Sequence, residues 1–239
     1  MFSRRTSSPA RVAQALLLRR VEYGESDLVV TLLTDTIGRI SALARGARKS
    51  VKRFGGVIEP MHTLRISYDD RSGAELVVLR EAKLERARPF LVTSLENMQA
   101  AGLALNWVRK AAPPRTPEPE VWAAMTELLD RLGDPDAKKS ARAMLAATGL
   151  RLLSAFGWGI DLERCVSCGK APGPAQAAAV DAARGGLICR DCGGARRRLS
   201  AGERLALGRA ASGGDLEEEH AALALELVEQ ALKAHGGIE

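Results

Sequence analysis

Short runs in which every second residue is hydrophobic dominate the first third of the chain. They cover residues 13–21, 27–34, 39–45, 62–68 and 74–80. Turn-forming residues separate them, in the stretches 23–26, 35–38, 55–56 and 69–73. A period of two is typical of strands with one buried face, and clusters of Gly, Asp and Ser end such strands. The pattern therefore predicts five short strands, with no helix among them.

The hydrophobic spacing becomes helical after residue 88. Residues 93–96 read TSLE, a capping box that predicts a helix start, and Pro113-Pro114 ends the run that follows. Thr116-Pro117 and Asp134-Pro135 open two further predicted helices, since a cap followed by proline favours a first turn. A last helix is predicted over about residues 216–235. The second part of the chain is therefore expected to be helical.

This order of elements predicts an α+β chain with two domains. Five strands without a helix pattern favour a small closed barrel or a sandwich, and the OB-fold is one five-stranded barrel. A flexible tail is expected over residues 1–10, the barrel over 11–85 and an all-helical domain over 86–239. The length of 239 residues suffices for two small hydrophobic cores.

Positive charge is concentrated in the barrel domain. The chain has a net charge of +6, and residues 1–85 carry 15 Lys and Arg against 10 Asp and Glu. Such an excess fits a polyanionic partner without proving one. No run of hydrophobic residues approaches the length of a secretory leader or a membrane span, so we expect a cytoplasmic protein without a membrane partner.

The segment GRISALARGARKSVKRFGG, residues 38–56, contains no acidic residue. Its first half alternates like a strand and its second half has the glycines of a loop. Its cations are Arg39, Arg45, Arg48, Lys49, Lys52 and Arg53. Arginine forks match phosphate geometry, so the segment predicts contact with a nucleic-acid backbone. The alternative is a solvated face with no ligand. Phe54 could stack on a base or could belong to the core at a strand edge.

Four cysteines form the pattern C-x2-C-x20-C-x2-C, at Cys165, Cys168, Cys189 and Cys192. Two close pairs about twenty residues apart are typical of a tetrahedral zinc site, and a glycine after each second cysteine suits a tight turn. We expect one structural Zn2+ in a module over residues 162–195, because protein ligands fill all four positions. The alternative is a pair of disulfide or redox motifs.

No motif for catalysis is found. The sequence lacks a phosphate-binding Gly-x4-Gly-Lys-Ser/Thr loop, a His-Glu-x-x-His helix, a Gly-x-Ser-x-Gly elbow and a dinucleotide fingerprint. The three histidines have no metal-ligand spacing. We therefore expect a binding protein and no catalytic residues.

Several stretches together resemble the RecO family of bacterial recombination mediators. They are AQALLLRRVEYGESDLVVTLLTDTIGRISALARGARK (13–49), GGVIEPMHTLRI (55–66), ERARPF (85–90) and LRLLSAFGWGIDLERCVSCGK (150–170), with the second cysteine pair downstream. The order of strand, Glu-Ser-Asp turn, strand, Gly-Arg, strand and Ala-Arg-Gly-Ala-Arg is the most specific part. The resemblance spans most of the chain.

The resemblance implies an N-terminal OB domain and a helical domain with an inserted zinc module. It implies a role in DNA repair and homologous recombination in the bacterial cytoplasm, in association with the nucleoid. The implied activities are binding of single- and double-stranded DNA and annealing of complementary strands. The implied partners are RecR and the C-terminal tail of the single-strand DNA-binding protein, which together help to load RecA. Some family members lack the cysteines, so zinc cannot be their shared mechanism.

The matching DNA-binding positions are the six cations of residues 38–56. For the acidic tail peptide, an apolar pocket rimmed by cations is expected on the helical domain. Two other interpretations remain open from the residues alone. One is an OB-fold and zinc RNA-binding factor of transcription or translation, and the other is a zinc-dependent or thiol redox enzyme.

Overall fold

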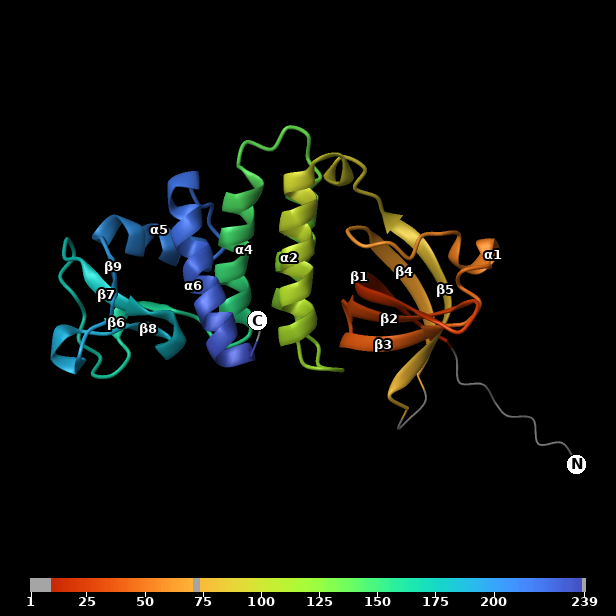
Figure 1. The fold of residues 1–239 in the computed structure, drawn as a ribbon, viewed down its shortest axis with the longest axis horizontal. Coiled ribbons are helices and arrows are strands. Elements are labelled where there is room, and N and C mark those ends of the chain that lie inside the picture. The colour runs from red at the N-terminus through yellow and green to blue at the C-terminus, as the bar shows by residue number, and fades with distance from the viewer. Residues whose placement is uncertain (1–9, 71–73, 238–239) are drawn as a thin grey trace, which may run out of the picture. The chain divides into compact units, whose positions relative to one another are not determined.

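A computed structural model describes residues 10–70 and 74–237. All but the last residue of the tail expected over residues 1–10 thus lies outside the described residues. The chain divides into two compact units (Figure 1). One comprises residues 1–88 and 112–119, and the other comprises 89–111 and 120–239. Among the described residues, no helix combines the length and hydrophobicity needed to cross a membrane.

The first unit is a closed five-stranded barrel, as the alternating pattern predicts. Its strands are β1 (Arg11–Tyr23), β2 (Asp27–Thr34), β3 (Gly38–Ala44), β4 (Thr63–Asp69) and β5 (Leu76–Arg86). They follow the order β1-β2-β3-β5-β4, with β3 and β5 parallel and the other pairs antiparallel. This arrangement fits an OB-fold. The sequence predicts no helix among these strands, and this prediction is wrong. Helix α1 (Val51–Phe54) forms one turn between β3 and β4.

A β-bulge in β1 changes which side chains enter the barrel. Ala13, Ala15 and Leu17 point into the core, but the register shifts between Leu17 and Arg19. One extra residue reverses the alternation that follows. Arg20 and Glu22, opposite the buried Val30 and Leu28, therefore project from the inner side at the barrel end. Arg19, Val21 and Tyr23 lie on the outer face.

The segment 112–119 packs along the edge of β3, although it follows α2 in the sequence. The guanidinium of Arg39 donates to the carbonyl of Ala112 at 2.6 Å, and the N–H of Arg115 donates to the carbonyl of Arg39 at 2.8 Å. Gly38 has φ +69°, and a Cβ there would lie 1.7 Å from the carbonyl oxygen of Thr116. Only glycine fits this approach.

The second unit has a helical core. Its helices are α2 (Leu95–Ala111), α3 (Pro119–Leu132), α4 (Ala141–Ala155), α5 (Ala201–Ala211) and α6 (Glu218–Gly236), with a short 3-10 turn η1 (Leu91–Thr93). Helix α4 is buried along most of its length and lies between α2 and α6 (Figure 1). Gly149 allows this packing, because a Cβ there would lie 3.0–3.1 Å from Val228 and Trp107.

Ion pairs connect the segment before α6 with α3 and with the segment before α4. Asp215 pairs with Arg131 at 2.7 Å and Glu217 pairs with Lys139 at 2.5 Å. Glu218 lies in the first turn of α6, where negative charge complements the helix dipole. These acidic residues therefore stabilise the start of α6 through ion pairs and through the helix dipole.

The cysteine module is a small sheet inserted between α4 and α5. Strands β6 (Asp161–Cys165), β7 (Ala178–Asp181), β8 (Gly186–Leu187) and β9 (Arg197–Leu199) follow the order β6-β8-β7-β9, with 3-10 turns η2 (Ala182–Arg184) and η3 (Arg190–Cys192). The second domain is thus not helical throughout, since it carries this four-stranded sheet. Strands of two to five residues are too short to show a period of two.

Candidate functional site

The basic segment runs along β3, the turn after it and α1, all within the barrel unit. Three hydrogen bonds fix the backbone of its turn. The N–H of Gly46 donates to Asp27 Oδ1 at 2.7 Å, and the N–H of Arg48 donates to the carbonyl of Ser26 at 3.0 Å. The guanidinium of Arg53 donates to the carbonyl of Arg45 at 2.7 Å. The turn after β3 is therefore fastened to the tip of the β1–β2 hairpin.

The six cations of this segment differ in their availability. Arg45, Lys49 and Lys52 are exposed, and no carboxylate of the described residues lies within ion-pair distance of them. Arg39 is partly buried, and its guanidinium is hydrogen-bonded to the carbonyl of Ala112. Arg48 forms an ion pair with Glu22 at 3.1 Å. Glu22 of β1 therefore lies beside the basic segment, although residues 38–56 themselves contain no acidic residue.

Phe54 belongs to the barrel core. Its side chain is 1% exposed and packs in the same cluster as Leu28 and Ile58. The guanidinium of Arg53 lies 5.1 Å from the ring centroid. Of the two alternatives for Phe54, the structure favours the core position, because the ring closes one end of the barrel.

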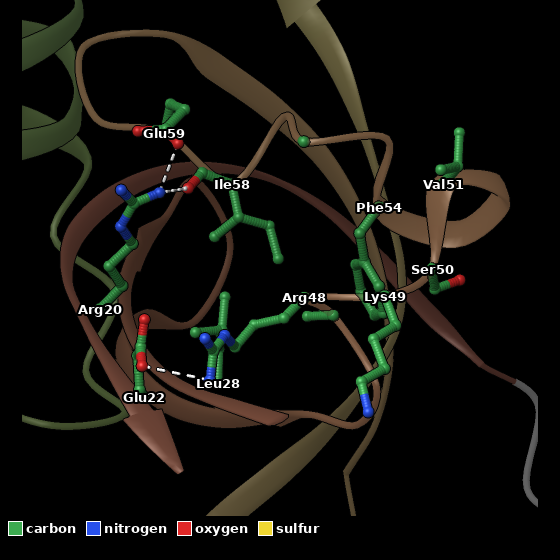
Figure 2. A pocket seen from close by; sticks show the side chains of 12 residues that line it. Arg20, Glu22, Leu28, Arg48, Lys49, Ser50, Val51, Phe54, Ile58 and Glu59 are labelled. Carbon is green, nitrogen blue, oxygen red and sulfur yellow. Dashed lines mark hydrogen bonds and ion pairs between the residues drawn. The ribbon is translucent and has the colours of Figure 1, made fainter. Parts of the chain in front are cut away.

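A cavity of about 450 Å³ opens beside this ring (Figure 2). Leu28, Phe54 and Ile58 contribute apolar side chains to its wall. Two arginines line the cavity, and each forms an ion pair with another lining residue. Arg20 pairs with Glu59, and Arg48 pairs with Glu22. Arg20 also donates to the carbonyl of Ile58 at 3.0 Å. The sequence did not single out Arg20, Glu22 or Glu59, because only the bulge in β1 turns the first two toward this cavity.

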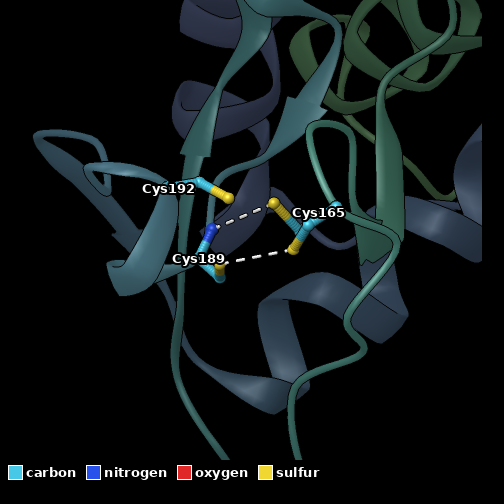
Figure 3. Close-up of side chains that lie close together, drawn as sticks. Cys165, Cys189 and Cys192 are labelled. Atoms are coloured by element: carbon cyan, nitrogen blue, oxygen red, sulfur yellow. Dashed lines mark hydrogen bonds between the residues drawn. The ribbon is translucent and has the colours of Figure 1, made fainter.

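The four cysteines meet in the second unit (Figure 3). Their sulfur atoms all lie within 4.8 Å of one another, and Cys168 and Cys189 are 3.6 Å apart. Within the described part of the chain, they form the one cluster of three or more His, Cys, Asp or Glu residues that could hold a metal ion. The glycines after the second cysteines, Gly169 and Gly193, have φ +75° and +97°. The predicted tight turns are therefore present.

The thiols of this cluster differ in acidity. The pKa of Cys165 is lowered to about 6, chiefly because the N–H of Cys189 donates to its sulfur at 3.3 Å. The pKa of Cys192 is raised to about 12, chiefly by its hydrogen bond with Cys189. The N–H of Lys170 acts to lower the pKa of Cys168, but the contacts with Cys189 and Cys165 leave it raised. A cation bound among these sulfurs would favour four thiolates.

A cavity of about 340 Å³ between α5 and the start of α6 differs from the peptide pocket expected on the helical domain. It is lined by Asp215, Glu217 and Glu219 together with Arg209 and His220. Its acidic character does not suit a peptide that is itself acidic.

Comparison with known proteins gives one consistent result. The family model described as "Recombination protein O N terminal" matches residues 11–88, and "Recombination protein O C terminal" matches residues 92–238. A protein named DNA repair protein RecO from Anaeromyxobacter sp. (strain K) is 38% identical over 202 residues, which are 83% of this chain and 78% of the relative. The protein of the same name from Geobacter sulfurreducens is 34% identical over 188 residues, or 79% and 75% of the two chains.

Proposed function

The chain belongs to the RecO family of DNA repair and recombination proteins, and from this premise we propose that it binds single- and double-stranded DNA and anneals complementary strands. With RecR, it would help to load RecA onto DNA covered by single-strand DNA-binding protein, whose C-terminal tail it would contact. The proposed DNA-binding domain is the barrel, residues 11–85. The protein acts by binding and positioning, without making or breaking covalent bonds.

The observation that supports this proposal most is the set of three exposed, unpaired cations beside β3. Arg45, Lys49 and Lys52 project from a turn and a helical turn whose backbone is hydrogen-bonded to its surroundings. Cations on such a fixed frame can contact successive phosphates without reading bases. Neutralised strands repel each other less, so complementary sequences can meet on the same surface. Individually weak contacts then let the duplex leave.

The first test is the binding of a labelled single strand, measured by fluorescence anisotropy over a series of salt concentrations. Three phosphate contacts predict that log K falls against log salt with a slope of about −2. Strands of unrelated sequence should bind with similar affinity. Absence of binding at low salt would overturn the proposal, and preferential displacement of the DNA by RNA would assign the protein to RNA.

Glu22→Gln is expected to strengthen this binding. The substitution removes the carboxylate that pairs with Arg48, which frees a fourth cation for a phosphate. We expect the affinity for a single strand to rise about 2- to 5-fold, and the salt slope to steepen by about 0.7. The exposed pair adds little stability, so the fold should be unaffected.

Glu25→Gln is the matched control for Glu22→Gln. Glu25 is exposed two residues beyond the end of β1, and no ion pair of the described residues involves it. Both variants remove one negative charge, but only Glu22→Gln frees an arginine. If both variants gain affinity for a single strand equally, the expected role of Arg48 is contradicted. The change in net charge would then explain the gain.

We further propose that Cys165, Cys168, Cys189 and Cys192 hold one structural zinc ion. Four sulfurs at about 2.3 Å from a tetrahedral ion lie about 3.8 Å from one another. The 3.6 Å between Cys168 and Cys189 is close to that value. The ion would stabilise the small sheet β6–β9. No step of DNA binding requires it.

A further inference from the structure

The outer face of the barrel beside the β1–β2 hairpin carries an exposed aromatic ring. Tyr23 is 60% exposed at the end of β1, and Val21 on the same face is 43% exposed. Tyr23 pairs with Asp27, and Val21 pairs with Val29. Residues paired in this way share one face of a sheet. The bulge after Leu17 places these side chains outside the barrel.

Two exposed arginines lie beside this apolar surface. Arg19 lies on the same face of β1, two residues before Val21. Arg45 lies two residues after Leu43, whose partner across the sheet is Val29. The outer face therefore carries Val21, Val29 and Leu43 across three strands. Arg19 stands two residues before this row on β1, and Arg45 stands two residues after it, beyond the end of β3. None of the ion pairs among described residues involves either arginine.

Tyr23 and the basic turn are also held close together through the backbone. Asp27, the partner of Tyr23 across the hairpin, accepts the N–H of Gly46 at 2.7 Å. Ser26, in the hairpin turn, accepts the N–H of Arg48 at 3.0 Å. Of the neighbouring acids, Glu22 lies on the opposite side of β1 and is paired with Arg48. Asp27 lies on the face of Tyr23 and accepts the N–H of Gly46, and Glu25 is exposed in the hairpin turn. The hairpin that carries Tyr23 is thus hydrogen-bonded to the turn that carries Arg45 and Arg48.

We propose that Tyr23 stacks on a nucleobase of a single strand whose flanking phosphates contact Arg19 and Arg45. This inference rests on the proposed DNA binding and adds the feature that distinguishes a single strand from a duplex. Aromatic rings accept any base by stacking, so the contact is tolerant of sequence. Bases in a duplex are already stacked on their neighbours and cannot reach the ring. The positive border makes a nucleic acid a better occupant than an apolar peptide.

The test compares the wild type with Tyr23→Ala and Tyr23→Phe on two labelled strands of equal length. One strand is oligothymidine, and the other is an abasic strand with the same phosphates. We expect the wild type to bind the thymidine strand about 5- to 30-fold more tightly than the abasic strand. Tyr23→Ala should lose this preference while keeping its salt slope and its affinity for duplex. Tyr23→Phe should retain the preference.

Phe90→Ala is the matched control, because Phe90 is 53% exposed and belongs to the other unit. It should leave the preference for bases unchanged. Wild-type affinity of Tyr23→Ala for the thymidine strand would overturn the stacking role while leaving the proposed function intact. If Tyr23→Ala keeps the preference for bases but loses binding to a protein partner, the stacking role is also overturned. The outer face would then be assigned to that protein. If the wild type binds neither strand, the proposed function fails and this inference fails with it.

Discussion

Replacing Arg45, Lys49 and Lys52 together with glutamate is expected to abolish strand annealing and to weaken single-strand binding by about 100-fold at physiological salt. Each charge-assisted contact with a phosphate contributes about 1 kcal/mol, and three contacts amount to about two factors of ten. The remaining binding should lose most of its dependence on salt. All three side chains are exposed, so the melting temperature should stay close to that of the wild type.

A second triple variant separates a local effect from a change in overall charge. Lys138, Arg196 and Lys233 are exposed in the other unit, and no ion pair of the described residues involves them. Their replacement with glutamate changes the net charge by the same amount. This variant should keep most of its DNA affinity and its annealing. An equal loss in both variants would contradict a defined site on the barrel, and wild-type annealing in the first variant would refute the mechanism.

The barrel could be predicted from the sequence because local signals and burial agree along its strands. In β3, Ile40, Ala42 and Ala44 are buried and the residues between them are not, which is the alternation visible in the sequence. The cysteine cluster could be predicted for a similar reason. The spacing within each pair and the glycine after it determine the turn locally, and donor chemistry determines the rest.

The parts that were missed depend on contacts between distant residues. Arg48 and Glu22 are 26 positions apart, so no inspection of residues 38–56 alone could show that this arginine is paired. The bulge in β1 has no marker such as glycine, yet it places Tyr23 outside and Arg20 inside. Phe54 stands in a run of cations, but the turn α1 directs its ring into the barrel end. In each case tertiary packing decides where the side chain lies.

Removal of the metal is expected to unfold the cysteine module while leaving DNA binding by the barrel in place. Binding free energies of structural zinc are about 10–16 kcal/mol near neutral pH, far more than a sheet with strands of two to five residues can supply. A strong chelator, or Cys168→Ser, should therefore abolish the melting transition of this module and expose it to protease. The thiols should react with a thiol reagent only after chelation, and the native chain should contain one zinc ion.

The dependence on pH follows from the thiols. Near pH 7, Cys165 with a pKa of about 6 is already largely ionised, whereas Cys192 with a pKa of about 12 and Cys168 with a raised pKa must each release a proton to bind metal. At least two protons are thus released, so the apparent affinity should rise by at least about 100-fold for each unit of pH near neutrality. Competition with a chelator of known affinity at pH 6.5 and 7.5 measures this slope.

The barrel serves as the control in the same experiment. The cysteines lie in one compact unit and the basic segment in the other, so single-strand affinity should change less than 3-fold on chelation. A parallel loss of DNA binding and module folding would show that the metal supports the DNA site. Four thiols that react at once in the native protein, with no zinc present, would instead favour the redox interpretation of the two cysteine pairs.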